Sequence, residues 1–263
     1  MTSHLNPIIF DQQKIAEFKD QYQKAQPYKH LVWDNFLKPD FAETLFQKFP
    51  SLNELSRHYH GLNENKSEGA SFDKFNPAFS QLRDALSSPG FLKILEEITG
   101  VKDLFSTDDA LGAGVHQGQN GSYLDIHIDF NIHHVKNIHR RLNLLVFLNK
   151  NWEDEYGGKL ELWNSDVSEC IHAYMPSFNR CVIFETNEIS YHGYSKITVP
   201  ENVTRKSFYS YYYTQLNENA ARYHDTTFKA RPSEGKVKKI KTDVKEKLKN
   251  NIKYWLKEFG IKI

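Results

Sequence analysis

Residues 142–148 read Leu-Asn-Leu-Leu-Val-Phe-Leu, an almost continuously apolar run. Such a run is typical of a β-strand that is covered on both of its faces. Three later segments also have strand character, and the last of them is very aromatic: residues 159–163, 180–186 and 207–214. Short strands separated by turn residues favour a sandwich or a barrel. The sequence therefore predicts a mainly β core over about residues 100–216, flanked by helices.

The chain before this core has mixed character. Apolar residues at helical spacing predict helices over 10–22, 39–46 and 77–99, and residues 30–36 read as a strand. Residues 56–75 are polar and rich in Gly, Asn and Ser, which predicts a long surface loop. This loop is interpreted either as a lid over a site or as a variable connection.

Composition narrows the function classes. The 263 residues carry a net charge of +1, which by itself does not indicate nucleic acid or membrane as a partner. Two cysteines, Cys170 and Cys181, are too few for an all-cysteine metal site and do not suggest a disulfide framework. No secretory signal precedes the first helix and no apolar run approaches 18 residues, so we expect a cytoplasmic protein without a membrane partner.

Residues 229–263 differ from the rest of the chain. They hold 12 Lys or Arg against 4 Asp or Glu, a net charge of +8, which leaves −7 on residues 1–228. Seven apolar residues advance by three or four positions: Val237, Ile240, Val244, Leu248, Ile252, Trp255 and Phe259. This stripe predicts an amphipathic helix that packs its apolar face on the domain and leaves its lysines in solvent. The alternative is a basic contact surface for nucleic acid, lipid or an acidic protein. We therefore divide the chain into a single domain that includes the N-terminal helices, 1–228, and a basic helical extension, 229–263.

A candidate metal site begins with His127-Ile128-Asp129. About 0.7 matches to His-x-Asp are expected by chance in a chain of this composition, so the tripeptide alone carries little weight. Two imidazoles and one carboxylate nevertheless form the facial triad that binds non-haem Fe(II) and leaves positions open for a co-substrate and O2. His192, beyond the strand at 180–186, is the candidate third ligand. Arg205 follows and suits the distal carboxylate of a dicarboxylate co-substrate.

These residues lie within a longer pattern that resembles the Fe(II)- and 2-oxoglutarate-dependent dioxygenases, specifically the prolyl-4-hydroxylase-like branch. The resemblance covers about residues 28–232. The matching segments follow the family's order along the chain: 112–116 (GAGVH), 121–130 (GSYLDIHIDF), 140–149 (RRLNLLVFLN), 156–163 (YGGKLELW), 176–186 (PSFNRCVIFET), 190–193 (SYHG) and 205–214 (RKSFYSYYYT).

The resemblance implies a double-stranded β-helix, a jelly roll of two packed sheets with supporting helices. It also implies that His127, Asp129 and His192 bind Fe(II), and that Arg205 binds the remote carboxylate of 2-oxoglutarate. Many relatives place a tyrosine against that carboxylate, and here the role falls to His116 or to Asn143, with Tyr123 as a pocket wall. The implied reaction consumes O2 and 2-oxoglutarate, with ascorbate as an optional reductant. It releases succinate and CO2 and hydroxylates a C–H bond.

Neither composition nor motif identifies the substrate, which we expect to be a peptidyl prolyl or other amino-acid residue, or a small metabolite. A non-catalytic jelly-roll module that binds a metal or a partner is the first alternative. The second is a hydroxylase that associates with nucleic acid or ribosomes through residues 229–263.

Overall fold

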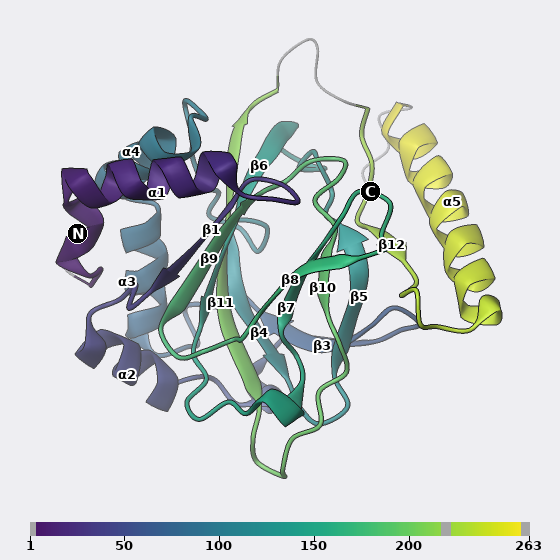
Figure 1. Cartoon of the computed structure of the whole chain (residues 1–263), viewed down its shortest axis with the longest axis horizontal. Coiled ribbons are helices and arrows are strands. Elements are labelled where there is room, and N and C mark those ends of the chain that lie inside the picture. The colour runs from purple at the N-terminus through teal and green to yellow at the C-terminus, as the bar shows by residue number, and fades with distance from the viewer. Residues whose placement is uncertain (1–3, 217–221, 259–263) are drawn as a thin grey trace.

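The computed structural model describes residues 4–216 and 222–258. Within these residues the fold contains five α-helices and one sheet of 12 strands, in which every pairing is antiparallel (Figure 1). The helices are α1 (Gln12–Lys24), α2 (Pro39–Gln47), α3 (Pro77–Leu86), α4 (Pro89–Thr99) and α5 (Lys236–Glu258). The strands are β1 (His30–Asp34), β2 (Arg57–His60), β3 (Glu64–Gly69), β4 (Ala113–Gly118), β5 (Tyr123–Ile128), β6 (Ile138–Phe147), β7 (Leu160–Trp163), β8 (Cys170–Tyr174), β9 (Arg180–Glu185), β10 (His192–Tyr194), β11 (Arg205–Gln215) and β12 (Thr227–Lys229). The predicted β-rich jelly-roll class is confirmed.

The sheet curls so that its two halves face each other across the site. Its strand order is β1-β9-β6-β11-β4-β3-β5-β10-β7-β8, with β2 paired to β3 and β12 paired to β5. The first five strands form the larger half, and β5-β10-β7-β8 form the smaller half. The sequence-distant strands β5 and β10 become neighbours in this order, which brings residues near 127 and 192 together.

The predicted central strand is β6, and both of its faces are buried. Leu142, Leu144 and Val146 point toward the large core that β6 shares with α1–α4. Phe147 points the other way, into a smaller cluster inside the curl with Val182 of β9. Helices cover one face of the strand, and the opposite half of the sheet covers the other. Both faces therefore need apolar side chains, which accounts for the continuous apolar sequence.

Local sequence determines where the N-terminal helices begin. Asp11 caps α1 by accepting a hydrogen bond from the Lys14 backbone amide at 2.9 Å, as a residue of this type does at a helix start. Proline is the first residue of α2, α3 and α4, a position that needs no backbone donor. These helices gather on one side of the sheet, whereas α5 lies alone on the other side, next to β12 (Figure 1).

Two expectations were wrong in detail. Residues 56–75 are not a loop, because β2 and β3 form a hairpin there and β3 also pairs with β4 and β5. The strand β3 has the sequence Glu-Asn-Lys-Ser-Glu-Gly, with partly buried and buried positions but no large apolar side chain. The sequence therefore contains no apolar pattern by which the strand could be recognised. The C-terminal helix is present, but it turns its apolar stripe toward solvent instead of toward the domain. No helix among residues 4–216 and 222–258 is long and apolar enough to cross a membrane.

Candidate metal and co-substrate site

His127, Asp129 and His192 meet where β5 and β10 pair. His127 lies near the end of β5, Asp129 directly follows that strand, and His192 opens β10 opposite His127. Gly193 permits this close pairing. A Cβ atom at that position would lie 2.7 Å from the Leu124 carbonyl oxygen and 2.9 Å from that of Asp125. Glycine is therefore required at this position for β10 to approach β5 closely enough to bring the imidazoles of His127 and His192 side by side.

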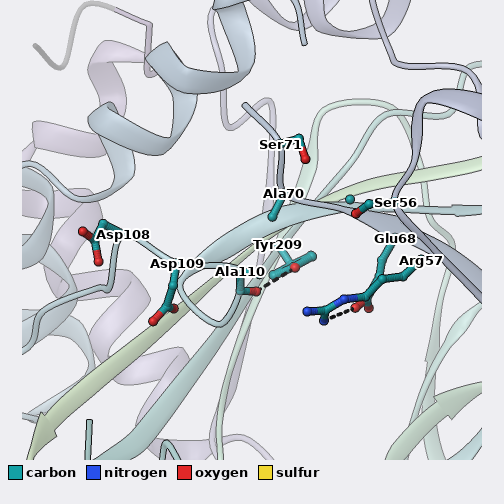
Figure 2. A pocket seen from close by; sticks show the side chains of 10 residues that line it. Ser56, Arg57, Glu68, Ala70, Ser71, Asp108, Asp109, Ala110 and Tyr209 are labelled. Atoms are coloured by element: carbon teal, nitrogen blue, oxygen red, sulfur yellow. Dashed lines mark hydrogen bonds and ion pairs between the residues drawn. The ribbon is translucent and has the colours of Figure 1, made fainter. Parts of the chain in front are cut away.

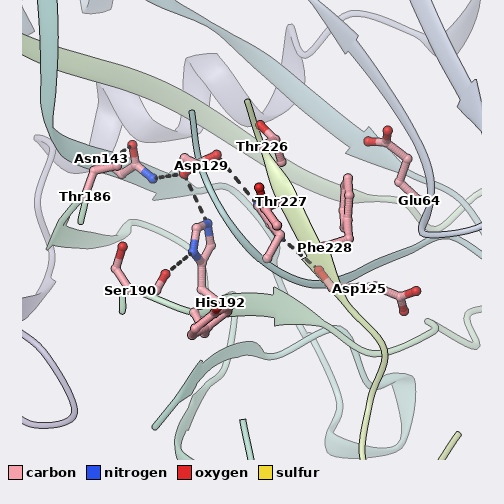
Figure 3. Close-up of polar contacts among 12 residues, drawn as sticks. Glu64, Asp125, Asp129, Asn143, Thr186, Ser190, His192, Thr226, Thr227 and Phe228 are labelled. Atoms are coloured by element: carbon pink, nitrogen blue, oxygen red, sulfur yellow. Dashed lines mark hydrogen bonds and ion pairs between the residues drawn. The ribbon is translucent and has the colours of Figure 1, made fainter. Parts of the chain in front are cut away.

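The three side chains converge on a common point. Nε2 of His127 lies 3.7 Å from Oδ1 of Asp129, and Nε2 of His192 lies 3.4 Å from Oδ2 of the same carboxylate. One potential ligand atom from each residue lies within 4.8 Å of the other two. Figure 3 shows His192 between Asp129 and the backbone carbonyl of Ser190. All three residues are buried.

Backbone carbonyls orient both imidazoles. Nδ1 of His127 lies 2.9 Å from the Asp125 carbonyl oxygen, and Nδ1 of His192 lies 2.9 Å from that of Ser190. Since a carbonyl only accepts, each Nδ1 carries the proton and each Nε2 presents a lone pair. Burial, then the neighbouring His192, lowers the pKa of His127 to about 3, and burial also lowers the pKa of His192. Both rings are therefore neutral at physiological pH, the state that binds metals.

Asp129 is held ionised by two residues of β6. Nδ2 of Asn143 donates to Oδ2 of Asp129 at 2.6 Å, and Nη2 of Arg140 donates to the same oxygen at 3.2 Å. Burial alone would raise the pKa of this carboxyl, but the Arg140 charge and the Asn143 hydrogen bond oppose it and hold the pKa well below its usual range. Two neutral imidazole nitrogens and one carboxylate form the donor set that suits Fe(II), so these residues fit the implied metal.

Arg140 is a candidate site residue that the sequence analysis missed. Its Nε and Nη2 donate to Oδ1 of Asn143 at 2.9 and 2.6 Å, and its guanidinium lies 3.5 Å from the centre of the Tyr211 ring. Arg140 therefore holds Asn143 and Asp129 together in a fixed geometry. The available signal was two polar residues of one strand, Arg140 just before its apolar run and Asn143 within it, but their contact with Asp129 depends on the tertiary fold.

A space, here called the inner cavity, extends from the three residues into the curl of the sheet. It is lined by Lys66, His116, Leu124, His127, Asp129, Asn143, Leu145, Leu160, Phe184, His192, Gly193, Tyr194, Arg205, Ser207 and Tyr211. The cavity therefore contains the three candidate ligands together with Arg205, His116 and Asn143.

Arg205 lies in this cavity as a buried cation. Its Nε donates to the Gly158 carbonyl at 2.7 Å, and its guanidinium lies 4.3 Å from the centre of the Tyr194 ring. Among the described residues no carboxylate lies within 4.0 Å of it, and burial lowers its pKa to about 10. A buried guanidinium without an acidic partner is costly on its own and well suited to an incoming carboxylate.

The other predicted co-substrate residues have different positions. His116 stacks on Tyr209 with ring centres 4.4 Å apart, and its Nε2 lies 3.5 Å from Oε2 of Glu68. Asn143 lines the cavity, but its amide is engaged by Asp129 and Arg140. Tyr123 is not among the lining residues, because its hydroxyl donates to the Gly61 carbonyl at 2.9 Å on the other side of β5.

Lys66 of β3 was not predicted and lies between the inner cavity and the outside. Its Nζ lies 3.5 Å from Glu68 and 3.9 Å from Glu64. Burial alone would lower the pKa of Lys66, but these carboxylates outweigh it and keep the pKa above its ordinary value. Its position in a segment interpreted as a loop concealed it.

A second space, the outer cleft, opens from the metal side of His127 and Asp129. It shares Lys66, Leu124 and Tyr211 with the inner cavity, and its outer wall is formed by β2, β12 and α5, including Arg57, Tyr59, Phe228, Lys245 and Lys249. A side groove continues from it past Arg57, Glu68, Ala110 and Tyr209 to Asp108 and Asp109 (Figure 2). The site thus continues from the inner cavity through the outer cleft into the side groove.

Comparison with known proteins gives consistent results. Residues 113–213 match the 2OG-Fe(II) oxygenase superfamily. Over 192 residues the chain is 26% identical to prolyl 3-hydroxylase OGFOD1 of Mus musculus, covering 71% of this chain and 33% of that protein. The chain therefore spans about a third of the length of this curated relative.

Solved structures agree in fold. A prolyl-4-hydroxylase from Pseudomonas putida superposes with a TM-score of 0.57 at 14% identity, covering 77% of this chain and all of that one. A prolyl hydroxylase from Trichoplax adhaerens, solved in complex with a peptide fragment of the hypoxia inducible factor oxygen degradation domain, has a TM-score of 0.57 at 15% identity, covering 76% and 91%. At these identities the likeness establishes the shared fold.

Proposed function

We propose that the chain is a 2OG-Fe(II) oxygenase of the prolyl-hydroxylase-like branch and that it hydroxylates a prolyl residue in an extended peptide. The observation that carries the oxygenase activity is the joint presence of His127, Asp129 and His192 with Arg205 around one inner cavity. The names of the relatives and the extended outer surface support the finer assignment of substrate.

The residues divide the work along the cavity. His127, Asp129 and His192 would hold Fe(II), which, once bound with 2-oxoglutarate, supplies the activation of O2 for oxidation of a C–H bond. Arg205 would bind the distal carboxylate of 2-oxoglutarate in bidentate fashion and so orient its keto acid end toward the metal. The lining side chains Leu145, Leu160 and Phe184 would exclude water around the co-substrate.

The substrate would enter through the outer cleft. Its lining includes the aromatic residues Tyr59, Phe130 and Phe228, and the Phe228 ring centre lies 5.3 Å from that of the candidate ligand His127. A prolyl ring is compact and apolar and would lie against aromatic side chains, while the flanking peptide would follow the side groove past Tyr209. A small metabolite would leave that groove unused.

Titration of the anaerobic protein with Fe(II) and 2-oxoglutarate tests the co-substrate site. We expect a visible metal-to-ligand charge-transfer band that is absent in His127→Ala and weakened in Arg205→Ala. Arg83→Ala, on the outer helix α3, is the matched arginine control and should keep the band. A folded protein without the band would contradict the oxygenase assignment and favour a non-catalytic binding module.

Peptide turnover tests the substrate class separately. Succinate release should rise with peptides that contain proline and should fall when the proline is replaced by alanine, with a mass gain of one oxygen on the prolyl residue. A charge-transfer band together with oxygen insertion at a residue other than proline would keep the oxygenase activity and overturn the prolyl assignment.

A further inference from the structure

The C-terminal helix α5 is docked on the domain through its polar side. Nζ of Lys238 lies 2.7 Å from Oδ2 of Asp125 on β5, and the Asn63 amide donates to the hydroxyl of Thr242 at 2.9 Å. Glu246 accepts a hydrogen bond from the Phe228 backbone amide of β12 at 3.2 Å. Thr242 and Glu246 are 0% and 3% exposed, so this polar side is the buried side of the helix.

The opposite side of α5 presents aliphatic side chains to solvent. Val237, Ile240, Val244, Leu248 and Ile252 are between 49% and 67% exposed. Among the other exposed large hydrophobic residues of the described chain, only Val135, at 66%, is comparable to the first four. An amphipathic helix on a soluble domain normally buries this stripe, so its exposure marks an interaction surface.

Lysines border the exposed stripe on both sides. At 100° per residue, Lys241 and Lys247 lie about 60° to either side of Val244, and both are exposed. The segment from residue 229 onward carries a net charge of +8. The surface, here called the α5 face, is therefore an aliphatic ridge with exposed lysines on both sides, and exposed Asp243 lies beyond Lys247.

Charge and shape favour one occupant. A second copy of the chain would place like-charged lysines opposite one another if two α5 faces met. A protein partner that inserts anchor side chains needs a pocket on the surface that it binds. The outer cleft is lined by Lys245 and Lys249 of α5 but by none of the stripe residues, so it offers no such pocket beside the stripe. A bilayer surface needs no pocket, and anionic headgroups complement the lysines.

We propose that the α5 face is a docking surface for anionic lipid bilayers. In this arrangement α5 lies in the plane of the interface, with Val237, Val244 and Leu248 among the headgroups and Lys241 and Lys247 at the phosphates. Trp255 and Phe259 continue the same spacing in the sequence, and tryptophan favours membrane interfaces. The helix does not span the bilayer.

Docking through α5 would also orient the site. Lys245 and Lys249 of the same helix line the outer cleft, and Nζ of Lys249 lies 3.7 Å from Asp225 in the wall of that cleft. The helix is at the edge of the molecule, with the sheet on its inner side only (Figure 1). The outer cleft would consequently open next to the lipid surface.

Vesicle co-sedimentation of the full chain tests the proposal without metal or turnover. The full chain should bind phosphatidylcholine vesicles that contain phosphatidylserine, and should bind pure phosphatidylcholine vesicles at least about tenfold more weakly. Val244→Asp and Leu248→Asp should each reduce anionic-vesicle binding by about tenfold or more, because each places a like charge in the headgroup layer. Val135→Asp, an equally exposed valine outside α5, is the matched control and should bind like the unaltered chain.

Three results would overturn the proposal. These are no binding of the full chain to anionic vesicles, equal binding by Val244→Asp, or equal binding to neutral and anionic vesicles. Sedimentation velocity without lipid distinguishes a second copy: a dimer that Leu248→Asp dissociates would assign the α5 face to self-association instead. Far-ultraviolet circular dichroism of each variant confirms folding, which these exposed positions should not disturb.

Discussion

At the scale of single residues, the position of Asp129 depends on two side chains that need not touch a metal. Asn143 donates to one carboxylate oxygen at 2.6 Å, and Arg140 contacts both Asn143 and Asp129 from a fully buried position. Residues that orient metal ligands in this way typically affect metal affinity by 10- to 100-fold. The site therefore depends on β6 as much as on the strands that carry its ligands.

The first prediction concerns this support. Asn143→Ala should weaken Fe(II) binding by about 10- to 100-fold, because Asp129 loses its shortest hydrogen bond and Arg140 loses its acceptor. Anaerobic calorimetric titration measures the affinity. Asn53→Ala, at an exposed position, is the control and should bind as the unaltered chain does. Unchanged affinity in Asn143→Ala would mean that Arg140 alone orients the carboxylate.

The second prediction concerns acid stability of the metal-free protein. Burial, with the Lys66 charge next, lowers the pKa of His116 to about 4 even though Glu68 opposes the shift. An imidazole in the unfolded chain titrates near pH 6.5, so between pH 6.5 and 4 the unfolded state binds the proton and the folded state does not. The contribution of neutral His116 to the free energy of unfolding is therefore fully present above pH 6.5 and is lost as the pH falls toward 4.

His116→Gln should therefore flatten the pH dependence of unfolding in that window. We expect its free energy of unfolding to fall by up to about 1.4 kcal/mol less per pH unit than that of the unaltered chain. Urea unfolding at pH 7.5, 6.0 and 5.0 measures both slopes. The difference between the two proteins should be constant above pH 7.5. Parallel curves below pH 6.5 would show that His116 does not contribute.

The candidate site was predictable in part because some of its signals are local. His127 and Asp129 are separated by one residue, and His192 and Arg205 stand in short recognisable motifs, so ligand type and order along the chain suffice to suggest them. Arg140 and Lys66 were not predictable, because an arginine or lysine acquires a role only through neighbours that the fold brings close. Tyr123 was predicted to line the pocket because it is close in sequence to His127. In the structure its hydroxyl donates to the Gly61 carbonyl instead, and the side chain does not line the cavity.

At the scale of elements, short β10 controls the distance between the two imidazoles. The strand has three residues and pairs with β5 on one side and β7 on the other. Gly193 is in its centre, where backbone oxygen atoms occupy the space that a side chain would need. A small change in the position of this strand would consequently move a candidate ligand.

The third prediction tests this packing. Gly193→Ala should cost about 1–3 kcal/mol of stability and should also weaken Fe(II) binding, because the new Cβ pushes β10 and His192 away from His127. Thermal unfolding and metal titration measure the two effects. Gly61→Ala is the matched control, since its Cβ would lie 3.7 Å from the nearest atom, an ordinary contact. A stable Gly193→Ala protein with normal metal affinity would contradict the argument.

Elements were predictable where apolar residues recur at helical spacing or form a nearly continuous apolar or aromatic run. The helices α1 to α4 and the strands β6, β9 and β11 met this condition. The β2–β3 hairpin did not, because its exposed and partly buried side chains are mostly polar and the pairing with β4 and β5 supplies its order. In α5 the periodicity indicated the helix correctly, but ion pairs with Asp125 and Asp225 determined which side faces the domain.

At the scale of the whole molecule, binding at the site would connect distant parts of the chain. The candidate ligands come from β5, its C-terminal end and β10, and Arg205 begins β11, which belongs to the opposite half of the sheet. A metal and a dicarboxylate that bind between these halves act only on the folded state. Mass action then converts their affinity into stability, by about 2.7 kcal/mol at 100 times the dissociation constant.

The fourth prediction is that Fe(II) with 2-oxoglutarate raises the melting temperature by about 5 to 10 °C under anaerobic conditions at saturating concentration. His127→Ala should lose the whole shift, because the metal anchors the co-substrate. Arg205→Ala should retain the shift caused by Fe(II) alone and lose the further increase caused by 2-oxoglutarate. Differential scanning fluorimetry measures each shift against the same variant without ligand, which corrects for differences in intrinsic stability. Leu248→Asp on the α5 face should show the full shift, since that surface is separate from both halves of the site. An Arg205→Ala protein that keeps the complete 2-oxoglutarate shift would place the co-substrate carboxylate elsewhere in the cavity, with Lys66 and His116 as the remaining cationic or donor side chains.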